Sequence, residues 1–203
     1  MTDSPAATLS TMAVLKSQTR PEHDRVEAAM RVESSLASES DYRGLLLRFA
    51  AALLPVDAAI QAHPAASILP DLATRSIRGS LLRDLRSLGV PEDTLYKLSE
   101  VEYLIDPTPA DLLGTLYTVE GSSLGGRVIS RMVREAMPDA PVAYFDRYGD
   151  AIGERWGTLK TVVDGELVKP RDRDAAVAAA KAVFARFHEP LPEELVSRVA
   201  VGD

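Results

Sequence analysis

The chain of 203 residues contains no cysteine, and this absence excludes disulfide bonds, thiolate metal sites and cysteine nucleophiles. A cysteine-free composition also suits a reducing compartment. No block of basic residues offsets the net charge of -7, which argues against nucleic-acid binding. No apolar run approaches the roughly 20 residues that a membrane span requires. We therefore expect a soluble, cytoplasmic protein that binds neither nucleic acid nor membrane.

The alternating pattern of a β-strand is also missing, whereas helical periodicity covers nearly the whole sequence. Pro21 is expected to interrupt the first helix and Pro55 to kink the second, because proline lacks the amide that a helix interior needs. Asp164 and Gly165 are expected to form a turn. The expected helices cover about residues 11–34, 40–61, 71–88, 91–102, 111–133, 143–163 and 172–188.

The sequence shows no internal repeat and no linker long enough to separate domains. Its first ten residues, MTDSPAATLS, lack the charged and then apolar layout of a signal peptide. We expect residues 1–10 to be a disordered leader. Residues 11–203 are expected to form a single all-α domain of seven or eight helices.

The segment DLLGTLYTVEGSSLGGRVISRMV, residues 111–133, carries four glycines within an amphipathic helical pattern. Each interior glycine costs a helix about 0.5–1 kcal/mol relative to alanine, so their presence needs a reason. At about 100° per residue, Gly114, Gly121 and Gly125 lie within about 40° of one another, with Thr118 beside them. This strip of bare backbone indicates that something flat or bulky lies against it. Close packing of another helix through small residues is the alternative.

Nitrogen ligands for a metal are scarce, because the sequence has only three histidines. His63 precedes a proline in a connector, where we expect it to be exposed to solvent. His188 lies at the end of the last expected helix, where a cation is favourable against the helix dipole. Neither position indicates a metal ligand, which leaves His23.

His23 lies on an amphipathic helix with Glu27 four residues later. Residues at this spacing are neighbours on one face, so Glu27 is able to hold one ring nitrogen and leave the other free to bind a metal. Lys16 lies two turns earlier, about 10 Å along the helix axis. Lys16 shares the face of His23 only if Pro21 does not restart the helix there.

A histidine helix and a glycine-bearing helix together suggest a planar ligand held between them. LKSQTRPEHDRVE (15–27) resembles the proximal helix of heme oxygenases, where a lysine, a threonine, the iron-binding histidine and a glutamate recur at these spacings. LGTLYTVEGSSLGGRVI (113–129) is similar to the distal helix of the bacterial enzymes of this family. YFDRYGDAIGERWGTL (144–159) resembles their Tyr-Gly…Gly…Trp segment, and RSIRGSLLRDLRSLG (75–89) is similar to their middle helix. The four matches follow in order along nearly the whole chain.

The resemblance implies an all-α, single-domain heme oxygenase-like fold with heme between the proximal and distal helices. It also implies cleavage of heme at a meso carbon to biliverdin, carbon monoxide and ferrous iron by O2. No dinucleotide or flavin motif is present, so the electrons are expected from an external reductase or a ferredoxin-like donor. The bacterial branch further suggests a bacteriophytochrome or another biliverdin acceptor as partner. A non-catalytic heme-binding or heme-sensing protein and a ligand-free helical partner-binding protein are the alternatives.

The resemblance also implies roles for five residues. His23 corresponds to the proximal iron ligand, and Glu27 to the partner of its second ring nitrogen. Lys16 pairs with a heme propionate if the Pro21 kink permits. Gly121 and Gly125 allow the distal backbone to lie close over the heme face.

Three further residues are expected near the heme. Ser122 takes the place of an aspartate that organises water in the animal enzymes, and the bacterial branch also tends to lack this aspartate. We expect Ser122 to organise water for proton delivery, with Ser123 and Arg127 as alternatives. Tyr117 either hydrogen-bonds a propionate or is a core aromatic residue. Arg155 is expected to face the propionates from a later helix.

Overall fold

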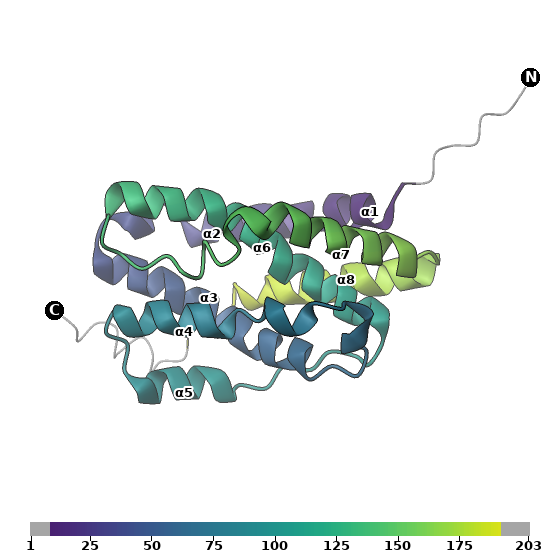
Figure 1. Ribbon diagram of the computed structural model, residues 1–203, viewed down its shortest axis with the longest axis horizontal. Coiled ribbons are helices and arrows are strands. Elements are labelled where there is room, and N and C mark those ends of the chain that lie inside the picture. The colour runs from purple at the N-terminus through teal and green to yellow at the C-terminus, as the bar shows by residue number, and fades with distance from the viewer. Residues whose placement is uncertain (1–8, 192–203) are drawn as a thin grey trace, which may run out of the picture.

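The computed structural model describes residues 9–191, and every regular element in this range is helical (Figure 1). The predicted all-α class is therefore confirmed. Residues 1–8 of the predicted leader lie outside the described residues. The eight α-helices of the described range are α1 (Thr11–Gln18), α2 (Arg20–Met30), α3 (Glu39–Gln61), α4 (Arg78–Ser87), α5 (Glu92–Glu100), α6 (Pro109–Ala136), α7 (Ile152–Glu166) and α8 (Pro170–Arg186).

The predicted interruption near Pro21 separates α1 from α2. Thr19 lies between the two helices, and its hydroxyl donates a hydrogen bond of 2.8 Å to the Leu15 carbonyl. Pro21 falls in the first turn of α2, where its missing amide is tolerated because amides of a first turn have no helical acceptor. Lys16 therefore belongs to α1 and His23 to α2, and they do not share the face of one continuous helix.

α3 is the long apolar helix of the core and continues through Pro55. Proline at this position leaves the Ala51 carbonyl without its helical amide, and Arg186 of α8 donates to that carbonyl at 3.1 Å. By length and composition α3 would also be able to cross a membrane, but 67% of the relevant window is buried inside the protein. Such burial is typical of the central helix of a globular fold.

The predicted helix over 143–163 is wrong at its start, because α7 begins only at Ile152. A buried carboxylate of α4 holds the preceding backbone in a different conformation. Asp84 accepts hydrogen bonds from the amides of Ala143 and Tyr144, at 3.1 and 2.7 Å. The segment before α7 is thereby tied to α4 and passes beside α6.

The predicted helix over 71–88 also begins later than expected. α4 starts at Arg78, after a short 3₁₀ turn. Asp57, buried in α3, accepts hydrogen bonds from the Ser76 hydroxyl at 2.7 Å and the Ile77 amide at 3.0 Å. This tertiary contact determines where α4 can begin.

Two further predictions are wrong for the same kind of reason. The turn expected at Asp164 is part of α7, and the Asp164 carboxylate accepts the Met12 amide at 2.9 Å. His63 is only 5% exposed, not solvated as expected. Its Nδ1 accepts the Ala65 amide at 3.1 Å, and its Nε2 lies 2.9 Å from the Asp106 carbonyl, to which Nε2–H donates.

The first half of α6 packs on α8, and this is the most extensive contact between helices in the described range. A Cβ atom at Gly114 would lie 2.1 Å from the Ala176 carbonyl oxygen, so only glycine permits this approach. Thr118 donates a hydrogen bond to the Ala180 carbonyl at 3.2 Å. α8 therefore fixes the position from which the second half of α6 extends.

Candidate functional site

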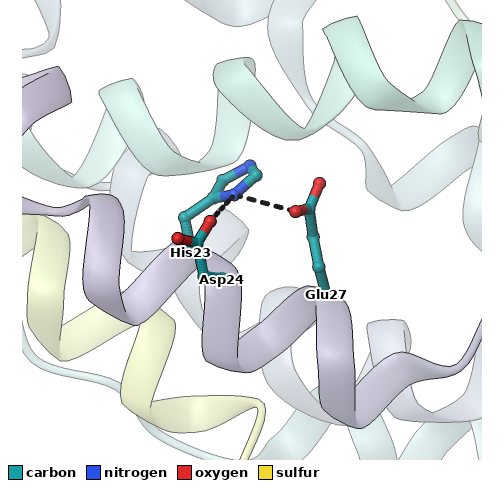
Figure 2. A group of neighbouring side chains, drawn as sticks. All are labelled: His23, Asp24 and Glu27. Atoms are coloured by element: carbon teal, nitrogen blue, oxygen red, sulfur yellow. Dashed lines mark ion pairs between the residues drawn. The ribbon is translucent and has the colours of Figure 1, made fainter.

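His23 projects from α2 beside two carboxylates (Figure 2). Its Nδ1 atom lies 3.5 Å from a carboxylate oxygen of Glu27 and 3.8 Å from one of Asp24. The imidazole side chain is 47% exposed, and the Phe184 ring of α8 contacts it edge-on with ring centroids 6.0 Å apart. Both carboxylates face Nδ1, which leaves Nε2 as the ring nitrogen for an incoming ligand. The sequence did not predict the contact with Phe184, because it joins two distant helices.

Tyr117 of α6 reaches the junction between α1 and α2. Burial raises the pKa of its hydroxyl, and a hydrogen bond with Thr19 opposes this effect. Its ring centroid lies 5.8 Å from that of Trp156 in α7. From this junction, α2 and the second half of α6 extend in the same direction (Figure 1). The residues that follow Tyr117 on α6 therefore run in the same direction as α2.

The four glycines of α6 fall into two pairs with different surroundings. A Cβ atom at Gly114 would clash with a carbonyl of α8, and one at Gly126 would lie 2.8 Å from a carbonyl in the segment before α7. At Gly121 the nearest atom to such a Cβ is an indole carbon of α7 at 3.7 Å, and at Gly125 nothing lies within 4 Å. Gly114 and Gly126 are therefore required by protein packing. A Cβ atom at Gly121 would make ordinary van der Waals contact with Trp156, whereas at Gly125 the surface of α6 is open.

Apolar side chains flank this open strip. Leu124 is 41% exposed and Val128 is 55% exposed, and both lie within about 60° of Gly121 around the helix. Exposed apolar residues gathered beside bare backbone are typical of a surface that contacts an apolar ligand. Helical spacing by itself places these two residues on the same side of the helix as the glycines.

The other predicted site residues are distributed around this strip. Ser122 is half-buried, and its hydroxyl donates to the Val119 carbonyl at 2.7 Å. Lys16 is exposed on α1. Arg155 donates to the Thr74 hydroxyl at 3.0 Å and stacks over the ring of Tyr148 at 4.6 Å. The structure thus places His23 beside Glu27. Arg155 instead lies at the edge of a separate group of polar side chains.

That group is centred on Glu120, directly before Gly121, and the side chains of Glu120, Arg75 and Arg147 are buried. The Glu120 side chain is 2% exposed and accepts hydrogen bonds from Arg75 at 2.9 Å, Arg147 at 3.1 Å and the Tyr148 hydroxyl at 2.8 Å. Arg75 also forms a bidentate pair with Asp71 at 2.8 and 2.9 Å. Burial raises the pKa of Tyr148 to about 12, so its hydroxyl remains a donor at neutral pH. We call these five residues the Glu120 cluster.

Sequence reasoning missed the Glu120 cluster. A glutamate inside an apolar helix pattern was a visible signal, because an unpaired charge is rarely buried. Its partners come from two separate segments, residues 71–75 and 147–148, so their identity could not be read from local spacing.

Fold and site together define a helical protein in which a histidine-bearing helix and a glycine-bearing helix offer surfaces to a planar ligand. The chain belongs to the heme oxygenase family, because the model of that family matches residues 9–193. The heme oxygenase of Xanthomonas campestris pv. campestris (strain 8004) is 36% identical over 120 residues, which cover 57% of this chain and 67% of that protein.

Solved structures show the same fold. The NO- and CO-bound heme oxygenase from Neisseria meningitidis superimposes with a TM-score of 0.74 at 18% identity, over 89% of each chain. Heme oxygenase-1 from the cyanobacterium Synechocystis sp. PCC6803 in complex with heme gives a TM-score of 0.64 at 18% identity, over 95% of this chain and 97% of that chain. Membership of this family makes the chain an oxidoreductase that degrades heme.

The residues of the site fit heme. The available Nε2 of His23 is a suitable nitrogen ligand for iron. The room at Gly125 and the exposed apolar side chains of Leu124 and Val128 suit the face of a large apolar ring. His23, Asp24 and Glu27 also place ligand atoms within 4.8 Å of one another, but all three residues are exposed, and exposed acidic groups of this kind are common without a bound ion.

Proposed function

We propose that this heme oxygenase cleaves heme at a meso carbon to biliverdin, carbon monoxide and ferrous iron, with His23 as the iron ligand and the α6 strip at Gly121 and Gly125 as the opposing wall. The different surroundings of the four glycines carry the proposal. Gly114 and Gly126 touch other backbone atoms, whereas Gly125 has nothing within 4 Å. A helix that omits side chains where the protein has nothing to pack leaves that space for a ligand.

Glu27 would set the orientation of His23. A carboxylate facing Nδ1 favours the tautomer in which Nδ1 carries the proton, and so keeps the Nε2 lone pair available. The distance of 3.5 Å between Nδ1 and Glu27 leaves room for a small rotation that would close this hydrogen bond. A carboxylate oxygen of Asp24 lies 3.8 Å from the same nitrogen and would strengthen the preference for the tautomer with the proton on Nδ1.

Gly121 and Gly125 would act by bringing backbone, and no side chain, against the distal side of the ligand. Heme supplies the iron that activates O2 and is also the substrate that is cleaved. The protein would direct this chemistry by placing no bulky side chain on the distal side of the heme and by holding a proton source nearby. Ser122 is suited to the second task, because its hydroxyl donates to the Val119 carbonyl and its lone pairs remain available to other donors.

Three residues would hold the propionates. Lys16 offers an exposed ammonium at the end of α1, and Tyr117 offers a hydroxyl at the start of α2 through its contact with Thr19. Arg155 would reach a propionate only by giving up its present hydrogen bond to Thr74. We therefore rank Lys16 and Tyr117 ahead of Arg155.

The electrons would come from an external reductase or a ferredoxin-like donor, because no dinucleotide or flavin motif occurs in the sequence. A bacteriophytochrome or another biliverdin acceptor would receive the product. Residues 11–203 would form the functional domain, and a cysteine-free composition supports a cytoplasmic location.

Hemin titration tests the proposed iron ligand. The wild-type protein should give a shifted Soret band, and His23→Ala should abolish the spectrum of the ligated iron. His188→Ala is the matched control, because His188 is an exposed histidine at the end of α8 and its loss should leave the spectrum unchanged. An unaltered spectrum in His23→Ala would show that another residue binds the iron.

Addition of a reductant under air separates catalysis from binding alone. Catalysis predicts loss of the Soret band and the appearance of biliverdin, identified by chromatography. A Soret band that persists without biliverdin would contradict the proposed reaction and would favour a heme-binding or heme-sensing role.

A further inference from the structure

Residues 141–145, which precede α7, are hydrogen-bonded to two core helices by buried polar groups. The Tyr42 hydroxyl of α3 donates a hydrogen bond of 2.6 Å to the Pro141 carbonyl. Asp84 of α4 accepts two backbone amides of the segment, at 3.1 and 2.7 Å. Asp84 is only 1% exposed, and hydrogen bonds to an ionised group are about twice as strong as those between neutral groups. These bonds therefore fix the position of the segment, which we call the brace.

The brace contacts α6 at two positions beside the open strip. A Cβ atom at Gly126 would lie only 2.8 Å from the Phe145 carbonyl oxygen, so the two backbones are in close contact there. Burial raises the pKa of Tyr144 to about 12, and a side-chain hydrogen bond with Ser122 opposes this effect. Ser122 and Gly126 each directly follow one of the two glycines of the strip. A change in the position of the brace therefore acts directly beside the strip.

Aromatic packing makes the brace rigid. The Phe49 ring of α3 lies 5.5 Å from the Tyr144 ring and 5.3 Å from the Phe145 ring, measured between centroids. Tyr144 and Phe145 are both buried. A close-packed interior transmits a displacement to its neighbours instead of absorbing it. A shift of the brace would therefore displace the part of α6 that it contacts.

The contacts of α6 elsewhere do not fix the strip independently of the brace. α8 contacts the first half of α6, through Gly114 and Thr118. In the middle of α6, the Glu120 cluster includes bonds to Arg147 and Tyr148, which follow shortly after the brace in the chain. The position of the strip therefore depends on the brace, and the position of the brace depends on Asp84.

The position of this wall matters for the cleavage of heme, because the meso carbons lie in different directions from the iron. A backbone wall close to the ring leaves room for O2 in some of these directions and excludes it from others. A misplacement of about 1 Å can cost about 100-fold in rate. A shift of a few tenths of an ångström should therefore change the relative rates at different meso carbons by about threefold or more.

We propose that Asp84 is a positioning residue that sets the regioselectivity of heme cleavage. Asp84 holds the brace, and the brace keeps the strip at Gly121 and Gly125 at a fixed distance from the heme face. Asp84 acts only through the brace. The inference rests on the proposed function, in which the strip is the distal wall of the site.

The distribution of biliverdin isomers tests the role of Asp84. Asp84→Asn keeps the size of the side chain, but its NH2 group is a donor where one of the two backbone amides needs an acceptor. The brace should shift, and the ratio of the main biliverdin isomer to the others, measured by chromatography, should change by about threefold or more.

Leu98→Ala is the control for a loss of stability alone. Leu98 is a buried residue of α5, and α5 and the second half of α6 lie on opposite sides of the molecule (Figure 1). Leu98→Ala should therefore keep the wild-type isomer ratio. A wild-type ratio in Asp84→Asn as well would overturn the proposal.

Crystal structures of the ligand-free variants test the arrangement without heme. In Asp84→Asn, residues 121–128 should be displaced relative to the first half of α6, whereas in Leu98→Ala they should keep the wild-type position. An undisplaced strip in Asp84→Asn would overturn the proposal, and so would a displaced strip with an unchanged isomer ratio.

Tyr42→Phe weakens the same brace without removing a buried charge. It removes the hydrogen bond to the Pro141 carbonyl and should also change the isomer ratio. If Asp84→Asn does not fold, a wild-type ratio in Tyr42→Phe overturns the proposal.

Failure of the proposed function would give a different result. A wild-type protein that binds no hemin, or that binds hemin without forming biliverdin, would contradict the proposed function and the regioselectivity with it. A wild-type protein that forms biliverdin with the same isomer ratio as Asp84→Asn would overturn only the role of Asp84.

Discussion

Glycine has no side chain, so the effect of each glycine of α6 on stability depends on the atoms that lie opposite it. Gly114 faces a carbonyl of α8 at a distance that excludes any Cβ atom, whereas Gly125 faces open space. Both are interior positions of the same helix, so the intrinsic preference for alanine over glycine applies equally to both. Their replacement by alanine therefore isolates the effect of the surroundings.

The same substitution should have opposite effects at these two positions. Gly125→Ala should raise the free energy of unfolding by about 0.5–1 kcal/mol, because alanine is the better helix former. Gly114→Ala should lower it by about 1–3 kcal/mol, the usual cost of forcing an extra group into a packed interior. Urea denaturation of both variants measures the difference. Gly125→Ala should nevertheless weaken hemin binding, and unchanged affinity would argue against Gly125 as a wall of the site.

Asp57 provides a pH-dependent prediction. Burial raises the pKa of its carboxyl above the ordinary value of 3.8, and hydrogen bonds from Ser76 and Ile77 oppose this effect only in part. The folded protein therefore binds this proton more tightly than the unfolded chain. The contribution of Asp57 to stability is largest at a pH below 3.8 and falls as the pH rises through the raised pKa.

Asp57→Asn removes this titration while keeping groups able to bond Ser76 and Ile77. The stability of the wild type relative to Asp57→Asn should fall as the pH rises from about 4 to 7. Urea unfolding of both proteins across this range gives the comparison. A relative stability that increased with pH would show that the hydrogen bonds, and not burial, dominate the pKa of Asp57.

At the scale of elements, α6 makes contacts with the rest of the protein at three positions along its length. α8 contacts its first half through Gly114, the Glu120 cluster holds its middle, and the segment before α7 packs on Gly126. The open strip lies among these contacts. The open backbone at Gly125 is therefore positioned by contacts on the other faces of α6.

Removal of the central carboxylate should be severe. Glu120→Ala would leave the buried guanidinium groups of Arg75 and Arg147 without this charge partner, which typically costs about 3–5 kcal/mol. Asp150→Ala removes an exposed carboxylate that pairs with Arg127 at 3.0 Å, and it should leave the urea midpoint nearly unchanged. Similar midpoints for the two variants would mean that the Glu120 cluster does not stabilise α6.

The elements also differ in how well the sequence predicts them. α6 was predicted to within a few residues at each end, because its apolar periodicity is strong and a proline marks its beginning. The start of α7 was predicted nine residues too early, since Asp84 of another helix holds the backbone of Ala143 and Tyr144. Local sequence contains no information about a hydrogen bond that comes from a distant helix.

At the scale of the whole molecule, a ligand between α2 and α6 should stabilise the entire fold. A ligand that binds only the native state adds about 2.7 kcal/mol to the free energy of unfolding at a concentration 100 times its Kd. Hemin should therefore raise the Tm of the wild-type protein, and His23→Ala should reduce the increase. An equal increase in both proteins would indicate that hemin binds elsewhere.

The sequence by itself determined the helical class, the strip of glycines and the pairing of His23 with Glu27, because helical periodicity places residues three or four positions apart on one face. Only the tertiary structure decided which glycines serve packing and which leave a surface open. It also decided that His63 is buried and that Arg155 joins Asp71 and Thr74. These outcomes depend on contacts between distant segments, and a side chain's burial and partners are properties of such contacts, not of local spacing.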